Sequence, residues 1–146
     1  MNLMHANPVT SPALYLKKRA EIINIYNEHA LLCSEEPTLD LSTIKKPTLL
    51  HVFYFDGIKG GVLVEQLMNY EKGAMITFAG IEDAITRNGV GTELVKLTSD
   101  YLIMQGIMVM GVQLNIGDKH EFWNKVGFTE LIDFHEHKAL IRPELE

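Results

Sequence analysis

Hydrophobic positions along the first half of the chain change from a helical to a strand-like pattern. Apolar residues recur at helical spacing through residues 12–33, which predicts an amphipathic helix. Residues 48–55, 61–68 and 74–81 are instead rich in β-branched and aromatic side chains and are joined by short turns. Three such segments in succession predict an antiparallel meander. A loop at residues 37–47 is predicted between the helix and the first of these strands.

The helical period returns after the third strand. The apolar positions that carry it are Val90, Leu94, Leu97 and Tyr101. Glycine is common just after the end of a helix, so Gly106 is predicted to end this one. Residues 107–115 are apolar on both faces, as expected of a central strand. A strand, a helix and a strand form a right-handed crossover, so residues 74–81 and 107–115 are predicted to run parallel.

A short helix at residues 118–125, ending at Gly127, and strands near residues 128–134 and 136–142 complete the predicted elements. We therefore predict an α/β (α+β) fold with a mixed sheet. An antiparallel meander is followed by a parallel strand pair, and helices cover both faces. With 146 residues, 47% of them hydrophobic, and no repeat, the chain is expected to form a single domain over residues 1–146.

Charge and cysteine content narrow the possible partners. The net charge is −6, and all of it lies in residues 51–146, because the first 50 residues carry five bases and five acids. No cluster of Lys and Arg is present to neutralise phosphates, which argues against nucleic acid as a partner.

Cys33 is the only cysteine, so no disulfide and no metal site is expected. No apolar run has membrane-spanning length and no basic leader is present, so we expect a cytoplasmic protein without a membrane partner.

A glycine-containing loop joins the third strand to the helix that follows. Its residues are Thr86, Arg87, Asn88, Gly89, Val90, Gly91 and Thr92. Glycines let a ligand approach the backbone, and the free amides of a helix start attract a pyrophosphate. The loop lacks the three glycines of the dinucleotide fingerprint and the Gly-Lys-Ser/Thr of a P-loop. An ordinary glycine-containing helix start is the alternative interpretation.

A second motif lies about thirty residues further on. It reads Glu-Phe-Trp-Asn-Lys-Val-Gly-Phe over residues 121–128 and follows a buried strand and a short helix. Together the two motifs resemble the GNAT superfamily of acetyl-CoA-dependent N-acyltransferases. That signature is Arg/Gln-x-x-Gly-x-Gly/Ala, an aliphatic strand, an Asn, and then Phe-Tyr-x-x-x-Gly-Phe. The resemblance covers about residues 48–142, and the order of elements matches throughout.

The resemblance implies a site for acetyl-CoA between the two parallel strands where they splay. It assigns the coenzyme A contacts to Ile81, Arg87, Asn88, Gly89, Val90, Gly91, Thr92, Asn115 and Trp123. Residues 48–142 would form the core, and the helical region of residues 1–47 would help shape the acceptor side. Relatives begin with a strand, for which only residues 3–5 are available here. We therefore expect that strand to be short or missing.

Three positions depart from the family pattern. Thr86 stands where Arg or Gln is usual, although Arg87 beside it could supply the charge. Trp123 stands where many relatives have the Tyr that protonates the leaving thiolate, and indole cannot take that role. The loss of general-acid help is worth about 10² to 10⁴-fold in rate, and core packing is the alternative role for Trp123. The usual positions of the base hold Thr77 and Met75.

His51 is the candidate replacement for the base. Regular hairpins would place His51 on one sheet face with Met75, Thr77 and Ala79, across one strand from Thr77. Histidine has a pKa suited to accepting a proton near neutrality, and Thr77 could position a water. A β-bulge would reverse this alignment, and a histidine that is only hydrogen-bonded within the sheet is the alternative.

These observations predict an N-acetyltransferase that moves an acetyl group from acetyl-CoA to a primary amine. The acceptor would be a small molecule or a peptide, and the acidic C-terminal part favours a cationic one. The protein would act as a monomer or homodimer. The alternative is a catalytically weak or inactive acyl-CoA-binding or regulatory domain that keeps the phosphate loop.

Overall fold

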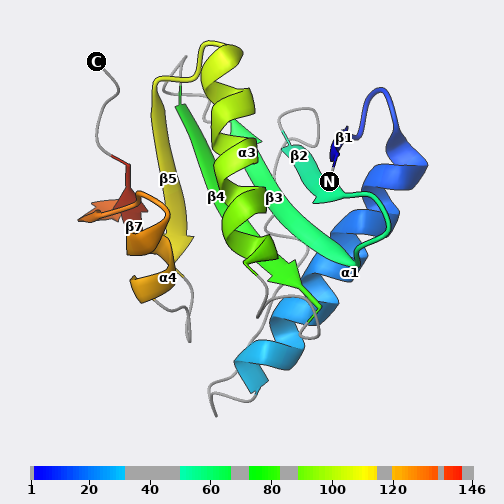
Figure 1. The fold of residues 1–146 in the computed structure, drawn as a ribbon, viewed down its shortest axis with the longest axis horizontal. Coiled ribbons are helices and arrows are strands. Elements are labelled where there is room, and N and C mark those ends of the chain that lie inside the picture. Colours follow the sequence, from blue (N-terminus) through cyan, green and yellow to red (C-terminus); the bar gives the residue numbers. More distant parts are fainter. Residues whose placement is uncertain are drawn as a thin grey trace.

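The computed structural model describes residues 2–31, 50–66, 73–82, 89–114, 120–134 and 137–142. The predicted loop at residues 37–47 lies outside them. The described strands form one sheet of seven in the order β1-β2-β3-β4-β5-β7-β6 (Figure 1). Their bounds are β1 Leu3–Ala6, β2 Leu50–Phe55, β3 Gly60–Gln66, β4 Gly73–Ile81, β5 Val109–Leu114, β6 Glu130–Phe134 and β7 His137–Ile141.

The strand pairing confirms the predicted mixed sheet. β2, β3 and β4 pair antiparallel in sequence order, as the meander requires. β4 and β5 pair in parallel, and β5 then pairs antiparallel with β7. The first strand, which we expected to be short or missing, is present as the four-residue β1 at the edge of the sheet beside β2.

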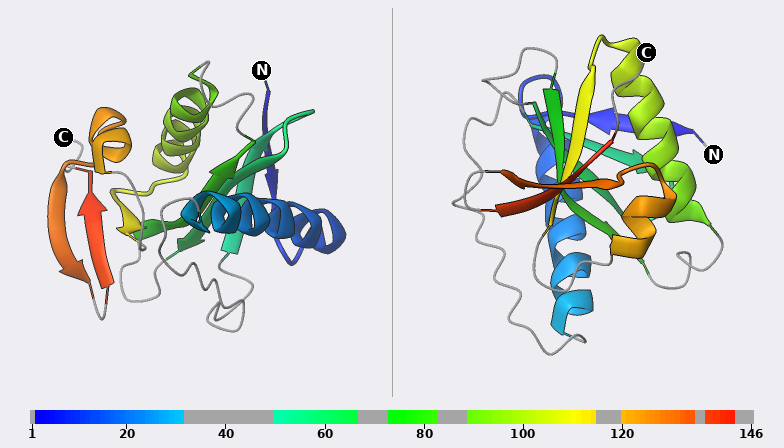
Figure 2. Two further views of the ribbon diagram at one scale, coloured as in Figure 1. Left: turned by 90° about the horizontal axis from the view of Figure 1, so that it is seen from below. Right: turned by 90° about the vertical axis from the view of Figure 1, so that its left-hand side faces the viewer.

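Three helices are described: α1 Pro12–Leu31, α3 Val90–Met104 and α4 His120–Lys125. α1 covers one face of the sheet, and α3 covers the other (Figure 2). Alternate side chains of each strand enter different cores because they point to opposite faces. Phe53 and Val62 pack in the core with α3, whereas Val52 and Leu63 pack in the core with α1.

Gly106 and Gly127 end their helices as predicted. Gly106 has φ of 93°, its amide donates to Ile103 O at 3.0 Å, and the amide of Ile107 donates to Leu102 O at 3.0 Å. Gly127 has φ of 107° and follows α4 in the same way. This pair of bonds satisfies carbonyls left open at the helix end and needs a residue that tolerates positive φ.

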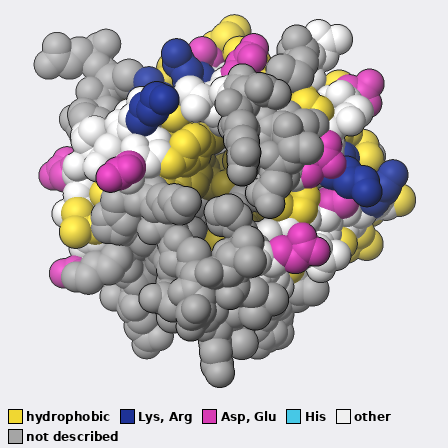
Figure 3. Space-filling view, turned by 60° about the horizontal axis from the view of Figure 1, so that its bottom comes forward, with side chains coloured by type: hydrophobic (Ala, Val, Ile, Leu, Met, Phe, Trp, Pro, Cys, Tyr) yellow, Lys and Arg dark blue, Asp and Glu magenta, His cyan; other side chains and the backbone are white. Residues whose placement is uncertain are grey.

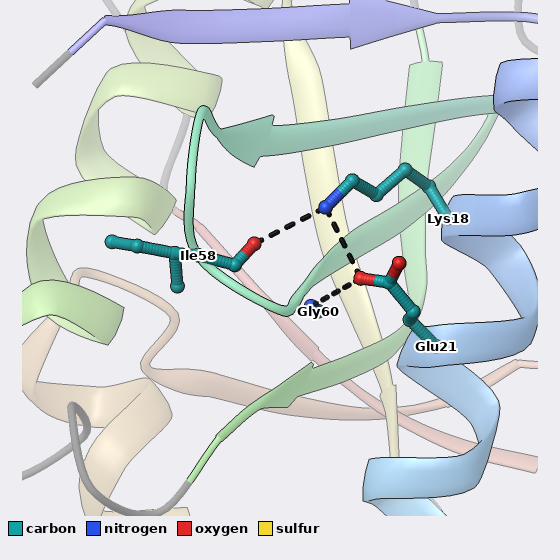
Figure 4. Close-up of polar contacts among 4 residues, drawn as sticks. All are labelled: Lys18, Glu21, Ile58 and Gly60. Atoms are coloured by element: carbon teal, nitrogen blue, oxygen red, sulfur yellow. Dashed lines mark hydrogen bonds and ion pairs between the residues drawn. The ribbon is translucent and has the colours of Figure 1, made fainter.

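Polar contacts fix α1 against the hairpin between β2 and β3 (Figure 4). Lys18 Nζ donates to Glu21 Oε1 and to Ile58 O, each at 3.1 Å. The amide of Gly60 donates to the same Glu21 oxygen at 3.1 Å. Lys18 Nζ also lies 4.4 Å from the centre of the Tyr54 ring, which favours a cation there. These bonds hold the helix in register with the sheet, and so position the side chains further along it.

Further along α1, its backbone approaches β4 at Gly80. A Cβ at Gly80 would lie 2.6 Å from Ile22 O and 3.1 Å from the Tyr26 amide nitrogen. The first distance is shorter than packed atoms allow and the second is tight, so only glycine fits without moving the helix. The close approach brings the second half of α1 to the part of β4 that forms the candidate site.

Candidate active site

The parallel strands β4 and β5 separate part-way along their length. Their ladder runs from Gly73 opposite Val109 to Ile76 opposite Val112. Beyond that pair β4 continues to Ile81, and the two ribbons diverge (Figure 1). The predicted splay is therefore confirmed. In open α/β sheets, ligands bind beyond the carboxyl ends of parallel strands.

A β-bulge at Thr77 marks the start of the splay. Leu63 pairs with Phe78, but the next residue, Val64, pairs with Ile76, so Thr77 is the extra residue of β4. The Thr77 hydroxyl donates to Leu63 O at 3.3 Å. Bulges bend a strand and redirect its side chains, and they are common next to active sites.

A small pocket of about 20 Å³ lies in the gap. It is lined by Tyr26, Thr77, Phe78, Ala79, Val112, Gln113 and Trp123. None of these side chains carries a formal charge, and the volume suffices for about one water molecule. The end of the molecule where β4 ends is hollowed, with apolar side chains around the hollow (Figure 3). The pocket thus combines an apolar wall with hydroxyl, amide and indole groups.

The start of α3 offers free backbone amides. Gly89 precedes the helix with φ of 76° and, as a glycine, has no side chain that could cap it. Its carbonyl accepts the first helical bond, from the amide of Glu93 at 3.1 Å. By helix geometry the amides of Val90, Gly91 and Thr92 have no carbonyl partner within α3. A helix N-terminus of this kind suits an anionic ligand.

This helix start lies beside the end of β4 and beside α4. A Cβ at Gly91 would lie 3.7 Å from Ile81 Cδ1 and 3.8 Å from Phe122 Cζ. The structure therefore brings together Ile81, the Gly89–Thr92 segment and Phe122 of α4. Arg87, Asn88 and Asn115, which the sequence places at the same site, lie outside the described residues.

Trp123 is buried and borders the pocket. It makes edge-to-face contacts with Phe122 and Phe128, at ring-centre distances of 5.0 and 5.9 Å. The same side chain therefore packs in the core and lines the gap between β4 and β5. Its indole can donate a hydrogen bond there but cannot supply an acidic proton.

The predicted alignment of His51 with Thr77 is wrong. His51 pairs with Val64, and Val64 pairs with Ile76 because of the bulge. Ile76 therefore lies across β3 from His51, and Met75 lies on the opposite face, since side chains alternate along a strand. The bulge shifts the register by one residue, which moves every side chain before it to the other face.

His51 instead belongs to a polar contact at the edge of the sheet. His5 Nε2 lies 2.8 Å from His51 Nδ1, and His51 Nε2 lies 3.2 Å from Gln66 Oε1. Because an amide oxygen only accepts, His51 Nε2 carries the hydrogen and His5 donates to Nδ1. Burial, and then the neighbouring His51, lower the pKa of His5 below its ordinary value. This contact joins β1 to β2, and His51 does not line the pocket.

Two of the pocket residues with polar side chains were missed by sequence reasoning. Tyr26 belongs to the apolar stripe of the first helix, and such a position is typical of a packing residue. Gln113 interrupts an otherwise apolar central strand, and that interruption was a usable signal. A polar side chain in a strand covered on both sides requires a partner or a ligand.

The sequence matches no family model and no curated protein. Solved structures are nevertheless similar to it. Gcn5 of Tetrahymena is 14% identical, with a TM-score of 0.71 over 97% of this chain and 95% of that chain. Ard1 from Thermoplasma volcanium is 17% identical, with a TM-score of 0.58 over 99% and 98%. The chain has the GNAT fold. The PaiA N-acetyltransferase of Thermoplasma acidophilum, solved in complex with coenzyme A, is 10% identical with a TM-score of 0.57 over 97% of this chain and 99% of that chain.

Within this GNAT fold, the described residues contain no group of three metal-ligating side chains. In the same part of the chain no helix is long and apolar enough to cross a membrane. Among the residues that the structure describes, the site offers neutral polar side chains and the backbone amides of the helix start.

Proposed function

We propose that this chain is an N-acetyltransferase that transfers an acetyl group from acetyl-CoA to a primary amine. The observation that carries the proposal is the geometry of the gap. Two parallel strands part at a bulge, a small uncharged pocket lies between them, and a helix start with free amides is adjacent. That combination fits a molecule with an anionic end and a thin thioester arm.

In this proposal the amides of Gly89 to Thr92 hold the pyrophosphate, with Arg87 and Asn88 completing the loop. The backbone near Ile81 bonds the pantetheine arm as it enters the gap. Asn115 and Trp123 complete the proposed coenzyme A contacts. The fit is supported by Gly89 at the N-cap of α3, because a glycine has no side chain that could occupy the first amides.

The proposed reaction is direct attack of a neutral amine on the thioester carbonyl. Backbone amides of β4 beyond its ladder with β5 stabilise the negative charge that develops on the carbonyl oxygen. Thr77 holds a water that accepts the proton of the amine. We leave His51 out of this chemistry because both of its ring nitrogens are bonded elsewhere.

The acceptor in this proposal is a small-molecule or peptide amine. Three carboxylates after the pocket strands are exposed in the described residues: Glu121, Glu130 and Asp133. Their charge would raise the local concentration of a cationic acceptor. The pocket itself carries no charge to hold an ammonium ion, so the reactive amine would enter in its neutral form.

Calorimetry with acetyl-CoA, followed by a thiol-release assay with a panel of primary amines, tests the proposal. We expect binding, and amine-dependent release of coenzyme A. Binding without release by any amine would favour the alternative, a regulatory acyl-CoA-binding domain, for which the indole at position 123 is the supporting observation. The absence of any binding would contradict both functions.

A further inference from the structure

We propose that Tyr26, a residue of the first helix, supplies the proton that the departing coenzyme A thiolate requires. The inference rests on the proposed acetyltransferase function and adds a residue to it. At the position from which the resemblance would supply a phenol, this chain has Trp123. A phenol nevertheless borders the same pocket, from α1 on the opposite face of the sheet.

The geometry places the two aromatic side chains around one point. α1 and α4 lie on opposite sides of the sheet (Figure 2), yet Tyr26 and Trp123 both line the pocket between β4 and β5. A pocket of about 20 Å³ has room for roughly one water molecule. Tyr26 and Trp123 therefore face the same small volume, into which a thioester entering the gap would have to pass.

Tyr26 is held firmly in this position. Its ring meets Phe78 edge to face, with ring centres 5.5 Å apart, and it is 9% exposed. The contacts of Gly80 with Ile22 and with the Tyr26 amide fix the adjacent helix backbone against β4. A positioned group of this kind needs little reorganisation during a reaction.

Tyr26 is also the pocket residue with a suitable proton. A phenol, with a pKa of about 10, is a much stronger acid than a threonine hydroxyl, a glutamine amide or an indole. The other three lining side chains, Phe78, Ala79 and Val112, carry no polar atom. Among the described residues that line the pocket, Tyr26 is thus the acid.

One phenol, together with the water held by Thr77, is enough to balance the proton transfers of the reaction. The amine nitrogen bonds to the thioester carbon, and the carbonyl electron pair moves to oxygen. When that pair returns, the carbon–sulfur bond breaks and the thiolate takes the Tyr26 proton. The water held by Thr77 accepts the extra proton of the former amine nitrogen and passes a proton to the phenolate, which leaves a neutral amide, free coenzyme A and intact Tyr26. Thr77 and Tyr26 line the same pocket of about 20 Å³, so one water can bridge them.

The test compares Tyr26→Phe with a matched control, Tyr15→Phe. Both tyrosines are buried on α1, but Tyr15 does not line the pocket. We expect Tyr26→Phe to lower kcat by about 10² to 10⁴-fold, with an unchanged Kd for acetyl-CoA, and Tyr15→Phe to retain kcat. The fall of kcat at alkaline pH, caused by ionisation of the phenol, should disappear in Tyr26→Phe.

A second variant returns the phenol to α4. In the Tyr26→Phe background, Trp123→Tyr should recover at least about 10-fold of the lost kcat, because the acid again borders the same pocket. Full turnover by Tyr26→Phe with an unchanged pH profile would overturn the inference while leaving the acetyltransferase intact. If wild type binds acetyl-CoA but acetylates no amine, both proposals fail. Circular dichroism melts establish that each variant is folded.

Discussion

The glycine at position 91 offers a direct way to separate folding from ligand binding. In the structure an added Cβ would meet Ile81 Cδ1 at 3.7 Å and Phe122 Cζ at 3.8 Å, both ordinary contacts. Gly91 lies in the first turn of α3 and does not have positive φ. Alanine is favoured over glycine in a helix by about 0.5–1 kcal/mol. We therefore expect Gly91→Ala to raise Tm by about 1–4 °C.

The same methyl group should weaken acetyl-CoA binding. If the first amides of α3 hold the pyrophosphate, a Cβ at Gly91 stands in the path of the phosphate oxygens. We expect Kd to rise by at least about 10-fold, which corresponds to a loss of about 1.4 kcal/mol. Thermal unfolding measures the expected gain in stability, and calorimetry on the same preparation measures the expected loss of acetyl-CoA affinity.

Gly89→Ala is the matched control for the effect of a glycine-to-alanine change on stability. A Cβ there meets nothing within 4 Å, but the residue has φ of 76°. Left-handed backbone costs a non-glycine residue about 1–2 kcal/mol, so this variant should lose stability. Unchanged acetyl-CoA affinity in Gly91→Ala, with the rise in Tm, would refute the reasoning, because the glycine would then have no role toward a ligand.

Three further predictions concern the framework of the site. Glu21→Ala leaves Lys18 buried without its carboxylate and should cost about 2 kcal/mol of unfolding free energy, measured by urea denaturation. Gly80→Ala forces a methyl group against Ile22 O at 2.6 Å, which should lower stability by about 1–3 kcal/mol in the same assay. The pKa of His5 lies below its ordinary value of 6.5, so the stability associated with its neutral form is present above pH 6.5 and is lost as pH falls through the lowered value. His5→Gln should make unfolding free energy less dependent on pH in that range, and an unchanged pH dependence would contradict this prediction.

Local chemistry explains most of the elements that the sequence predicted. α3 follows from its helical period, and Gly106 ends it because the last turn needs a residue with positive φ. The parallel relation of β4 and β5 follows from the handedness of a strand–helix–strand crossover. Residues 32 and 33, predicted to be helical, lie outside the described part of the chain.

The bulge at Thr77 could not be predicted from the residues around it. Glycine and proline, which often mark such irregularities, are absent there, and both registers bury apolar side chains. The choice depends on how β3 and β4 pair over their whole length and on where β5 ends its ladder. The error at His51 follows directly, because a shift of one residue exchanges the two faces of a strand.

Tyr26 illustrates a different limit. In the sequence it is one of several large side chains on an amphipathic helix, and its spacing is that of a packing residue. Its place at the pocket depends on the contact of α1 with Gly80 and on the Lys18–Glu21 pair that fixes the helix. Both are contacts between segments distant in sequence, which periodicity does not report.

The most direct test of the central claim is mass spectrometry of the products formed from acetyl-CoA and a panel of primary amines. We expect an N-acetylated amine and one free coenzyme A for each acetyl group transferred, with both products missing when the amine is omitted. Acetyl-CoA recovered intact with every amine, or coenzyme A released with acetate and no acetylated amine, would contradict it.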